Sequence, residues 1–197
     1  MENSGVLKLG FMSILLTIIL LNCSGQNPEQ LVEKYETLYN SHDVEKLMSL
    51  YSDEAVFEVV GLFKLSDTEK IRGVAQYDSA LDLTMTISDI KVRGDTAFFK
   101  LQENNDWLHA MEIEAAYYDP AYIVFRKNLV YHIKAEASPE TMEAFKTAME
   151  GFWPWANENA ANRLAEMIPD GEFIYNAQNA VKVVKIINEY KASMKNK

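Results

Sequence analysis

The two side chains best suited by type and spacing to acid–base chemistry are Asp106 and His109, which stand three positions apart. Residues three apart on a helix share a face, so the carboxylate could orient the imidazole for proton transfer. The competing interpretation is that Asp106 caps the helix and His109 is a solvated surface residue, and we favour it. Both residues are therefore kept as candidates without a catalytic assignment.

Other catalytic and binding chemistries lack the residues that they need. The remaining histidines, His42 and His132, are too far from His109 in sequence to show the spacing of a zinc site. The chain has no glycine-rich phosphate loop, no nucleophile elbow and no paired cysteines, so we predict no metal and no cofactor. The net charge of −10, without a Lys/Arg cluster, disfavours binding to nucleic acid.

Residues 1–23 predict a targeting segment. Leu9 to Leu21 is an apolar run that is too short to span a bilayer comfortably but suits the central region of a signal peptide. It leads to Cys23, the only cysteine, and Leu20 to Cys23 resembles a bacterial lipobox. The resemblance implies lipidation of Cys23, a tether over residues 24–27 and a location on a membrane of the bacterial cell envelope. The alternative is an ordinary signal peptide or uncleaved anchor, with a secreted or periplasmic protein as one outcome.

The stretch from Leu31 to Gly61 predicts two amphipathic helices followed at once by a strand. Apolar residues recur at helical spacing within Leu31–Tyr39 and again within Val44–Tyr51. β-Branched and aromatic residues then fill Ala55–Val60. The rest of the chain must position its side chains around this unit.

A short helix over Val74–Leu81 and a series of antiparallel strands are expected next. The strands alternate apolar and polar residues and are predicted at Leu83–Val92, Thr96–Glu103, Tyr122–Arg126 and Leu129–Ala137. Residues 104–113 predict a short helix or ordered loop at the mouth of the sheet, although their alternation also permits a strand. Helices followed by a sheet predict an α+β domain over residues 28–137.

Residues 138–197 predict a helical C-terminal extension packed on that domain. Ser138 and Pro139 suit a helix start, and Pro154, between two tryptophans, is expected to break or kink this helix. Asn176 or Asn179 is expected to cap the last helix.

The opening stretch resembles the nuclear-transport-factor-2-like superfamily, which includes SnoaL-like polyketide cyclases and ketosteroid isomerases. The resemblance lies in Tyr39-Asn40-Ser41-His42-Asp43, in the helix Leu47–Tyr51, and in Ser52-Asp53-Glu54-Ala55-Val56. It implies a cone-shaped, curved antiparallel sheet wrapped on the N-terminal helices around a pocket.

The resemblance also implies positions for catalytic groups. Tyr35 stands where the isomerases carry a catalytic tyrosine on the first helix, whereas their two acidic groups would fall near Val59 and Ala121, which are apolar. Glu58 is next to Val59, but neighbouring strand residues face opposite ways, so Glu58 should face away from the pocket. We therefore expect a hollow without a proton acceptor and no isomerase chemistry.

Three functions remain open at this stage. The preferred one is a domain that binds a small apolar or aromatic ligand without catalysis, and the alternative is a SnoaL-like acid–base enzyme. The side chains expected to line the pocket, or else simply to fill the core, are Tyr35, Tyr39, Phe99, Trp107, Met111 and Tyr122. The third is a protein that binds a partner, either as a homodimer through the outer sheet face or through Trp153 and Trp155.

Overall fold

The computed structural model describes residues 27–195. The predicted signal segment and its lipidation site, Cys23, lie outside the described residues. Both stay predictions from the sequence.

Helices and strands follow one another in an α+β order. They are α1 (Pro28–Asn40), α2 (Val44–Met48), β1 (Tyr51–Val59), β2 (Phe63–Leu65), α3 (Thr68–Ala80), β3 (Thr84–Arg93), β4 (Thr96–Asn104), α4 (Asp106–Ala110), β5 (Ala116–Arg126), β6 (Leu129–Ala137), α5 (Pro139–Asn159), α6 (Ala161–Met167), a 3-10 turn (Pro169–Gly171) and α7 (Ala177–Lys195).

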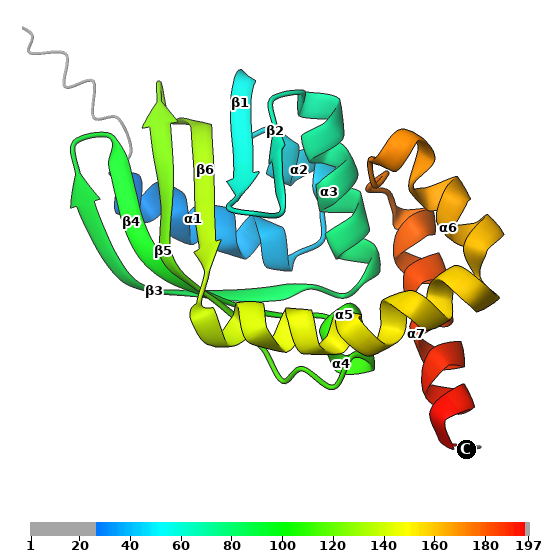
Figure 1. Cartoon of the computed structure of the whole chain (residues 1–197). Helices are drawn as coiled ribbons and strands as arrows, with labels where there is room; N and C mark the ends of the chain where they lie inside the picture. Colours follow the sequence, from blue (N-terminus) through cyan, green and yellow to red (C-terminus); the bar gives the residue numbers. More distant parts are fainter. Residues whose placement is uncertain (1–26, 196–197) are drawn as a thin grey trace, which may run out of the picture.

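One curved sheet of six strands, in the order β2-β1-β6-β5-β4-β3, forms the centre of the structure. Figure 1 shows the long β3 and β4 bending across the molecule. Neighbouring strands are antiparallel except β1 and β6, which run parallel. The predicted α+β class and the curved sheet wrapped on N-terminal helices are confirmed, and the parallel pair makes the sheet mixed.

Helices α1 and α3 supply the apolar residues that cover the sheet. The buried stripe of α1 is Leu31, Val32, Tyr35 and Tyr39, and that of α3 is Ile71, Val74 and Ala75. In Figure 1, α1 crosses behind the sheet and α3 stands beside β2. The sheet and these helices share one core, because their buried residues form a single apolar cluster.

Some boundaries differ from the predicted ones for local reasons. The second helix ends at Met48 and β1 begins at Tyr51, so Tyr51 belongs to a strand rather than to a helix. Helix α3 begins at Thr68, because Asp67 accepts a hydrogen bond of 2.8 Å from the backbone N–H of Glu69. The short helix expected within residues 104–113 is confirmed as α4, capped by Asn105.

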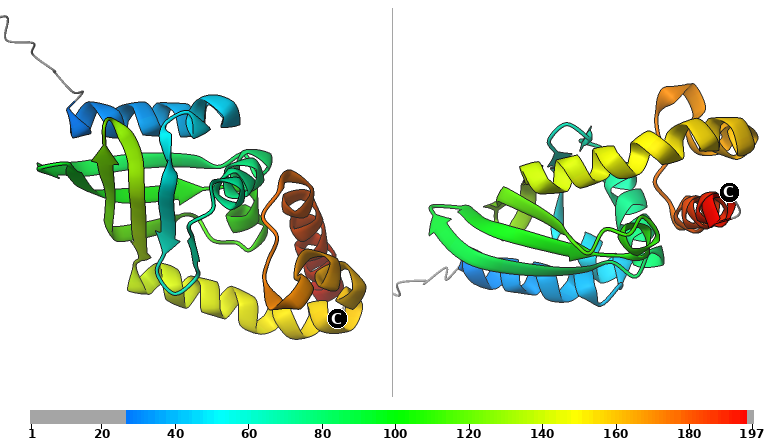
Figure 2. Two further views of the ribbon diagram at one scale, coloured as in Figure 1. Left: turned by 90° about the horizontal axis from the view of Figure 1, so that it is seen from above. Right: turned by 60° about the horizontal axis from the view of Figure 1, so that its bottom comes forward.

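The C-terminal extension forms a second apolar cluster from α5, α6 and α7, which lies beyond α3 in Figures 1 and 2. Pro154 does not break α5, which continues to Asn159. The carbonyl that loses its donor belongs to Glu150, which is exposed, so water can replace the missing bond. Asn176 accepts from the N–H of Asn179 at 2.8 Å and caps α7 as predicted. Within residues 27–195, none of the helices combines the length and apolar character that crossing a membrane requires.

Candidate functional site

A small cavity of about 30 Å³ lies between α1 and the inner face of the sheet. This volume has room for one or two water molecules. Residues from α1 and from five strands line it: Tyr35, Tyr39, Phe57, Val59, Met85, Ile87, Phe99, Leu101, Glu103, Tyr118, Ala121, Ile133, Lys134 and Ala135. The lining is mostly apolar and aromatic, with Glu103 as its single carboxyl group.

Glu103 reaches the cavity because it continues the inward alternation of β4. Ala97, Phe99 and Leu101 face inward along this strand, and Glu103 is the next residue of the same face. Its neighbours across the ladders are Met85 on β3 and Ala116 on β5, which are both buried. The register of the sheet therefore fixes a carboxyl group beside an apolar chamber.

Asp78 brings a second carboxyl group from α3. It stands at helical spacing after Ile71, Val74 and Ala75, so it extends the buried stripe by one turn. Tyr39 of α1 donates its hydroxyl hydrogen to Oδ2 of Asp78. Asp78 is therefore linked to the cavity by a hydrogen bond from Tyr39, which lines it.

Tyrosine hydroxyls surround the two carboxyl groups. The Tyr118 hydroxyl is hydrogen bonded to the Glu103 carboxyl. The hydroxyls of Tyr35 and Tyr51 lie 3.0 Å apart, and the rings of Tyr35 and Tyr39 are 5.6 Å apart. Burial raises the pKa of Tyr35 and of Tyr39 well above the usual value, so both stay neutral hydrogen-bond donors at neutral pH.

The surroundings change the acidity of both carboxyl groups. Each residue is half-buried, and dense packing around the carboxyl raises the pKa of Asp78 to about 7. Burial and the negative charge of Asp78 raise the pKa of Glu103 to about 8. Near neutral pH the pair therefore contains one group that is mostly protonated and another that is partly ionised, which is the arrangement that proton transfer needs.

Three of the residues predicted to line the pocket do so. Tyr35, Tyr39 and Phe99 line the cavity, and so do Val59 and Ala121, the apolar residues at the positions of the isomerase acids. Glu58 faces outward, as expected, and its carboxylate lies 3.2 Å from Nζ of Lys64 and 3.5 Å from Nζ of Lys134.

The other three predicted lining residues lie outside the cavity. Trp107 packs on Phe145 of α5, with ring centres 5.5 Å apart, and Met111 faces the C-terminal helices. Tyr122 is on the outer face of β5, with its ring centre 5.6 Å from that of His132. The sequence pattern placed these aromatic and apolar side chains near the sheet but could not say which face or which helix they contact. A homodimer through the outer face stays a prediction.

Asp106 and His109 are both exposed on α4, away from the cavity lining. Asn105, rather than Asp106, caps this helix by accepting from the N–H of Leu108 at 2.8 Å. Helix α4 packs against the C-terminal helices and does not cover the cavity.

The expectation of a hollow without a proton acceptor is wrong. Glu103 lines the cavity, and Asp78 is hydrogen bonded to Tyr39, which also lines it. Each continues an apolar periodicity by one step, Asp78 on α3 and Glu103 on β4. This continuation is a signal that could have found both residues in the sequence. It was missed because a polar residue at the end of an apolar stripe more often lies at the solvent edge.

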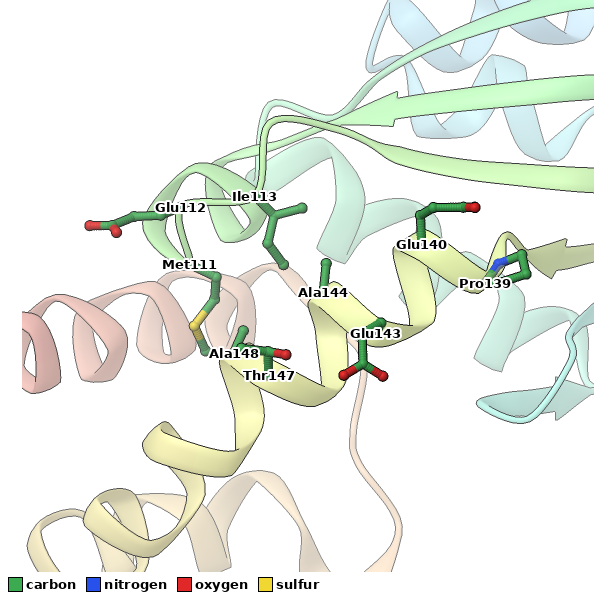
Figure 3. Close-up of a pocket in the computed structure, with 9 residues that line it drawn as sticks. All are labelled: Met111, Glu112, Ile113, Pro139, Glu140, Glu143, Ala144, Thr147 and Ala148. Carbon is green, nitrogen blue, oxygen red and sulfur yellow. The ribbon is translucent and has the colours of Figure 1, made fainter.

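A larger hollow, of about 650 Å³, is an open surface groove between α5 and the residues that follow α4. Figure 3 shows Met111 and Ile113 facing Ala144 and Ala148 across it, with glutamates at its edge. Two of these glutamates already have lysine partners: Glu112 lies 2.9 Å from Lys191 and Glu143 lies 3.9 Å from Lys146. The groove is larger than the cavity, but hydrogen bonds lower the pKa of Glu112 and of Glu140 at its edge, so the cavity is the better candidate site for acid–base chemistry.

Metal chemistry has no support from side-chain clustering within the part of the chain that the structure describes. No group of three or more His, Cys, Asp or Glu side chains there could hold an ion. Asp78 and Glu103 are paired with tyrosines instead.

Comparison with known proteins identifies the fold. Neither a protein-family model nor a curated protein matches the sequence. Among solved structures, SalBIII, an epoxide hydrolase/cyclase-like enzyme in pyran ring formation in polyether salinomycin, matches with a TM-score of 0.52 and 11% identity, over 58% of this chain and 92% of that chain. An LEH-like epoxide hydrolase of M. tuberculosis matches with a TM-score of 0.50 and 9% identity, over 63% and 88% of the two chains.

Another similar structure is an NTF2-like protein of unknown function from Cytophaga hutchinsonii, with a TM-score of 0.49 and 8% identity, over 59% of this chain and 95% of that chain. At these identities the likeness concerns the fold alone. This chain has the nuclear-transport-factor-2-like fold that its opening stretch indicated.

Proposed function

We propose that this chain, with its nuclear-transport-factor-2-like fold, is an acid–base enzyme that moves protons on a small molecule held in the cone. The observation that carries the proposal is the placement of two carboxyl groups at one chamber. Glu103 faces the cavity directly, and Asp78 is joined to it through the hydroxyl of Tyr39. Two acids with different environments at one site are a recognised arrangement for separate acid and base roles.

Each carboxyl group has a role that follows from its protonation. Glu103, with a pKa of about 8, is mostly protonated near pH 7 and donates a proton to an oxygen of the substrate. Asp78, with a pKa of about 7, is partly ionised and accepts a proton through Tyr39. In a keto–enol conversion, Tyr39 would take the proton from the α-carbon while passing its own to Asp78. The C–H electron pair becomes the C=C bond, and the carbonyl oxygen takes the Glu103 proton.

The charges around the cavity restrict the class of substrate. Lys134 contributes to the lining, but its ammonium group pairs with Glu58, which faces outward. A carboxylate or phosphate group in the chamber would therefore meet carboxyl and phenol groups without a cation beside them. The substrate class that fits is a neutral, largely apolar molecule with at least one oxygen atom.

Substrate binding requires the chamber to enlarge. About 30 Å³ accepts water but not an organic molecule. Phe57, Ile87 and Leu101 line the cavity and are only half-buried, so outward rotation of these side chains would enlarge it. Met85, an adaptable side chain, also lines the cavity.

The second candidate function is binding of an apolar ligand without catalysis. The aromatic lining of Tyr35, Tyr39 and Phe99 favours it, because such rings contribute large apolar contact area. In that case Glu103 would only orient the ligand by a hydrogen bond. Removal of the carboxyl groups distinguishes the two functions. An enzyme would lose its catalytic activity, whereas a binding protein would have no catalytic activity to lose.

Hydrogen–deuterium exchange at the α-carbon of neutral ketones tests the proposal. Cyclohexanone and acetophenone in D₂O, followed by NMR, are suitable probes, and Glu103→Gln and Asp78→Asn are the variants. We expect each variant to lose about 10²-fold or more of the exchange catalysed by the wild-type chain. Glu143→Gln, in the surface groove, is the matched control and should exchange at the wild-type rate. Ketone binding without exchange above the buffer rate would overturn catalysis in favour of the binding function.

The cellular location is a separate proposal, supported by the sequence alone. We propose that Cys23 is lipidated and anchors the chain to a membrane of the bacterial cell envelope, with residues 24–27 as the tether. Labelled palmitate should be incorporated by the full chain in a bacterial host and not by Cys23→Ser. Equal labelling of the two proteins, or none of either, would leave the secreted or periplasmic alternative.

A further inference from the structure

Side chains from α1 and from the turn after it close the free edge of the sheet. Strand β3 is the last strand of the sheet and pairs only with β4, so the backbone groups on its other side need different partners. Three side chains supply them. The pairs, with the distance between the bonded atoms, are Glu36 and the N–H of Ile87 (3.2 Å), Asn40 and the N–H of Met85 (2.8 Å), and His42 and the carbonyl of Leu83 (2.8 Å). Helix α1 therefore takes the place of a further strand along this edge.

Asn40 makes the most complete of these contacts. Its Nδ2 donates to the carbonyl of Met85 at 2.9 Å, and its Oδ1 accepts from the N–H of the same residue at 2.8 Å. The side-chain amide thus presents to Met85 both the donor and the acceptor that a paired strand would present. Glu36 and His42 each make one bond to this edge. The Asn40 amide accordingly fixes the distance and the register between the end of α1 and β3.

This contact lies between the two halves of the candidate site. Tyr39 directly precedes Asn40 and donates its hydroxyl hydrogen to Asp78. Met85 stands opposite Glu103 in the ladder between β3 and β4. Tyr39, Met85 and Glu103 all line the cavity. Two hydrogen bonds of one side chain therefore join the Asp78 half, which the helices carry, to the Glu103 half, which the sheet carries.

Apolar packing alone would leave this junction loose. The buried stripe of α1 belongs to the apolar core that it shares with the sheet. Apolar contacts hold two surfaces together but are non-directional, so they allow a helix to shift along its axis. Hydrogen bonds, by contrast, have preferred lengths and angles. A shift of α1 along β3 would stretch both bonds of Asn40 and would move Tyr39 relative to Glu103.

We infer that Asn40 is a positioning residue that holds the Tyr39–Asp78 pair at a fixed spacing from Glu103. The inference rests on the proposed function, because it concerns the same site. In the keto–enol conversion described above, Tyr39 must meet the α-carbon while Glu103 meets the carbonyl oxygen, and the bonds of the ketone set the distance between these two atoms. Asn40 is not among the residues that line the cavity, so it acts through its neighbours rather than on the substrate.

The test uses two variants of Asn40 and a matched control on the same helix. Asn40→Ala removes both bonds to Met85. Asn40→Asp keeps the size of the side chain and the acceptor for the N–H of Met85, but it places an oxygen against the Met85 carbonyl. Glu36→Ala is the control, because it also removes a hydrogen bond from α1 to β3. Its partner Ile87, however, stands opposite Leu101 rather than opposite an acid.

Deuterium exchange over a range of cyclohexanone concentrations gives kcat and KM for each protein. We expect both Asn40 variants to lose about tenfold or more in kcat, because a misplacement of about 1 Å has effects of this size or larger. KM should stay within about threefold, because the apolar lining is unchanged, and Glu36→Ala should keep both constants within the same range. Urea denaturation gives the folded fraction, and rates are compared per folded molecule.

A second readout does not depend on catalysis. Crystal structures of the wild-type, Asn40→Ala and Glu36→Ala chains give the distance between the Tyr39 hydroxyl and the Glu103 carboxyl. We expect this distance to change by about 1 Å or more in Asn40→Ala, the size of displacement that affects catalysis. In Glu36→Ala the distance should stay unchanged.

The outcomes separate this inference from the proposed function. If the wild-type chain exchanges no ketone above the buffer rate, the catalytic function fails. The crystal structures then decide the positioning role alone: a changed distance in Asn40→Ala supports it, and an unchanged distance overturns it. If the wild-type chain is active, a wild-type kcat in both Asn40 variants, or an equal loss in Glu36→Ala, overturns the positioning role and leaves the proposed function in place. A loss of rate that only follows the folded fraction overturns the role in the same way.

Discussion

Two glutamates of the same sheet, Glu103 and Glu58, have opposite acidities. Glu103 lies on the inner face of β4, beside the cavity, where burial and Asp78 raise its pKa to about 8. Glu58 lies on the outer face of β1, where hydrogen bonding to Lys64 is the main cause that lowers its pKa. Both residues are half-buried, so exposure alone does not separate them.

The difference between the two faces lies in the partners that they provide. The outer face gives Glu58 two ammonium groups, at 3.2 and 3.5 Å. The inner face gives Glu103 a phenol hydroxyl and a second carboxyl group. A charge without a compensating cation is disfavoured in partly dry surroundings, so Glu103 retains its proton. The comparison indicates that the inner acids serve proton transfer and the outer acid serves the structure of the sheet.

The largest expected effect is the difference between the two titrations. With ¹³C-labelled glutamate, we expect the midpoint of Glu103 near pH 8 and that of Glu58 below the usual range, at least about three pH units lower. Glu103→Gln and Glu58→Gln assign the signals. Midpoints of Glu103 and Glu58 within one pH unit of each other would show that the two faces of the sheet are electrostatically equivalent.

The next effect concerns stability. Below about pH 4 the Glu103 carboxyl is protonated in both the folded and the unfolded chain. Between about pH 4 and 8 this carboxyl is ionised in the unfolded chain but still largely protonated in the folded one. Folding then takes up a proton, so the free energy of unfolding falls as pH rises towards 8, and the destabilisation is complete above that pH. Glu103→Gln removes it and should raise the free energy of unfolding by about 1–3 kcal/mol at pH 9, with little change at pH 4.

Urea denaturation at pH 4 and pH 9 measures this change. Glu58→Gln is the matched control on the outer face and should not become more stable at pH 9, because it loses its lysine partners. A Glu103→Gln protein that is less stable than the wild type at pH 9 would contradict the raised pKa of Glu103.

The smallest expected effect is a rise in the titration midpoint of Glu58 when one of its lysine partners is removed. Lys134→Met removes one of the two ammonium partners of Glu58 and leaves Lys64 in place. We expect the midpoint of Glu58 to rise by less than about one pH unit, and less still at high salt, because exposed ion pairs are weak and screened. Glu103 should titrate unchanged. A shift of Glu103 equal to that of Glu58 would mean that the Lys134 ammonium group also acts in the cavity.

Much of the fold could be predicted because it depends on local patterns. The helical spacing of Leu31, Tyr35 and Tyr39 placed α1, and the alternation of Ala97, Phe99 and Leu101 placed the inner face of β4. The two predicted strands on either side of Lys127 and Asn128 leave room for a two-residue turn, and both residues have positive φ as such a turn requires.

The candidate site was only partly predictable. The outward orientation of Glu58 followed from its neighbour Val59 on the same strand. By contrast, Trp107, Met111 and Tyr122 were assigned to the cavity because they are large and apolar, and the structure places all three elsewhere. Residue type predicts burial but not which of several buried surfaces a side chain joins.

Local patterns in the sequence are enough to predict which residues share a face of α1, α3 or β4. The net charge of −10 likewise disfavours binding to nucleic acid without any knowledge of the fold. The packing of separate elements, by contrast, brings Asp78 of α3 to Tyr39 of α1 and Tyr175 of the extension to Tyr77 of α3. The physical reason is that a local pattern specifies the face of one element. The pKa of a carboxyl, however, depends on every group within a few ångströms, and those groups come from elements far apart in the chain.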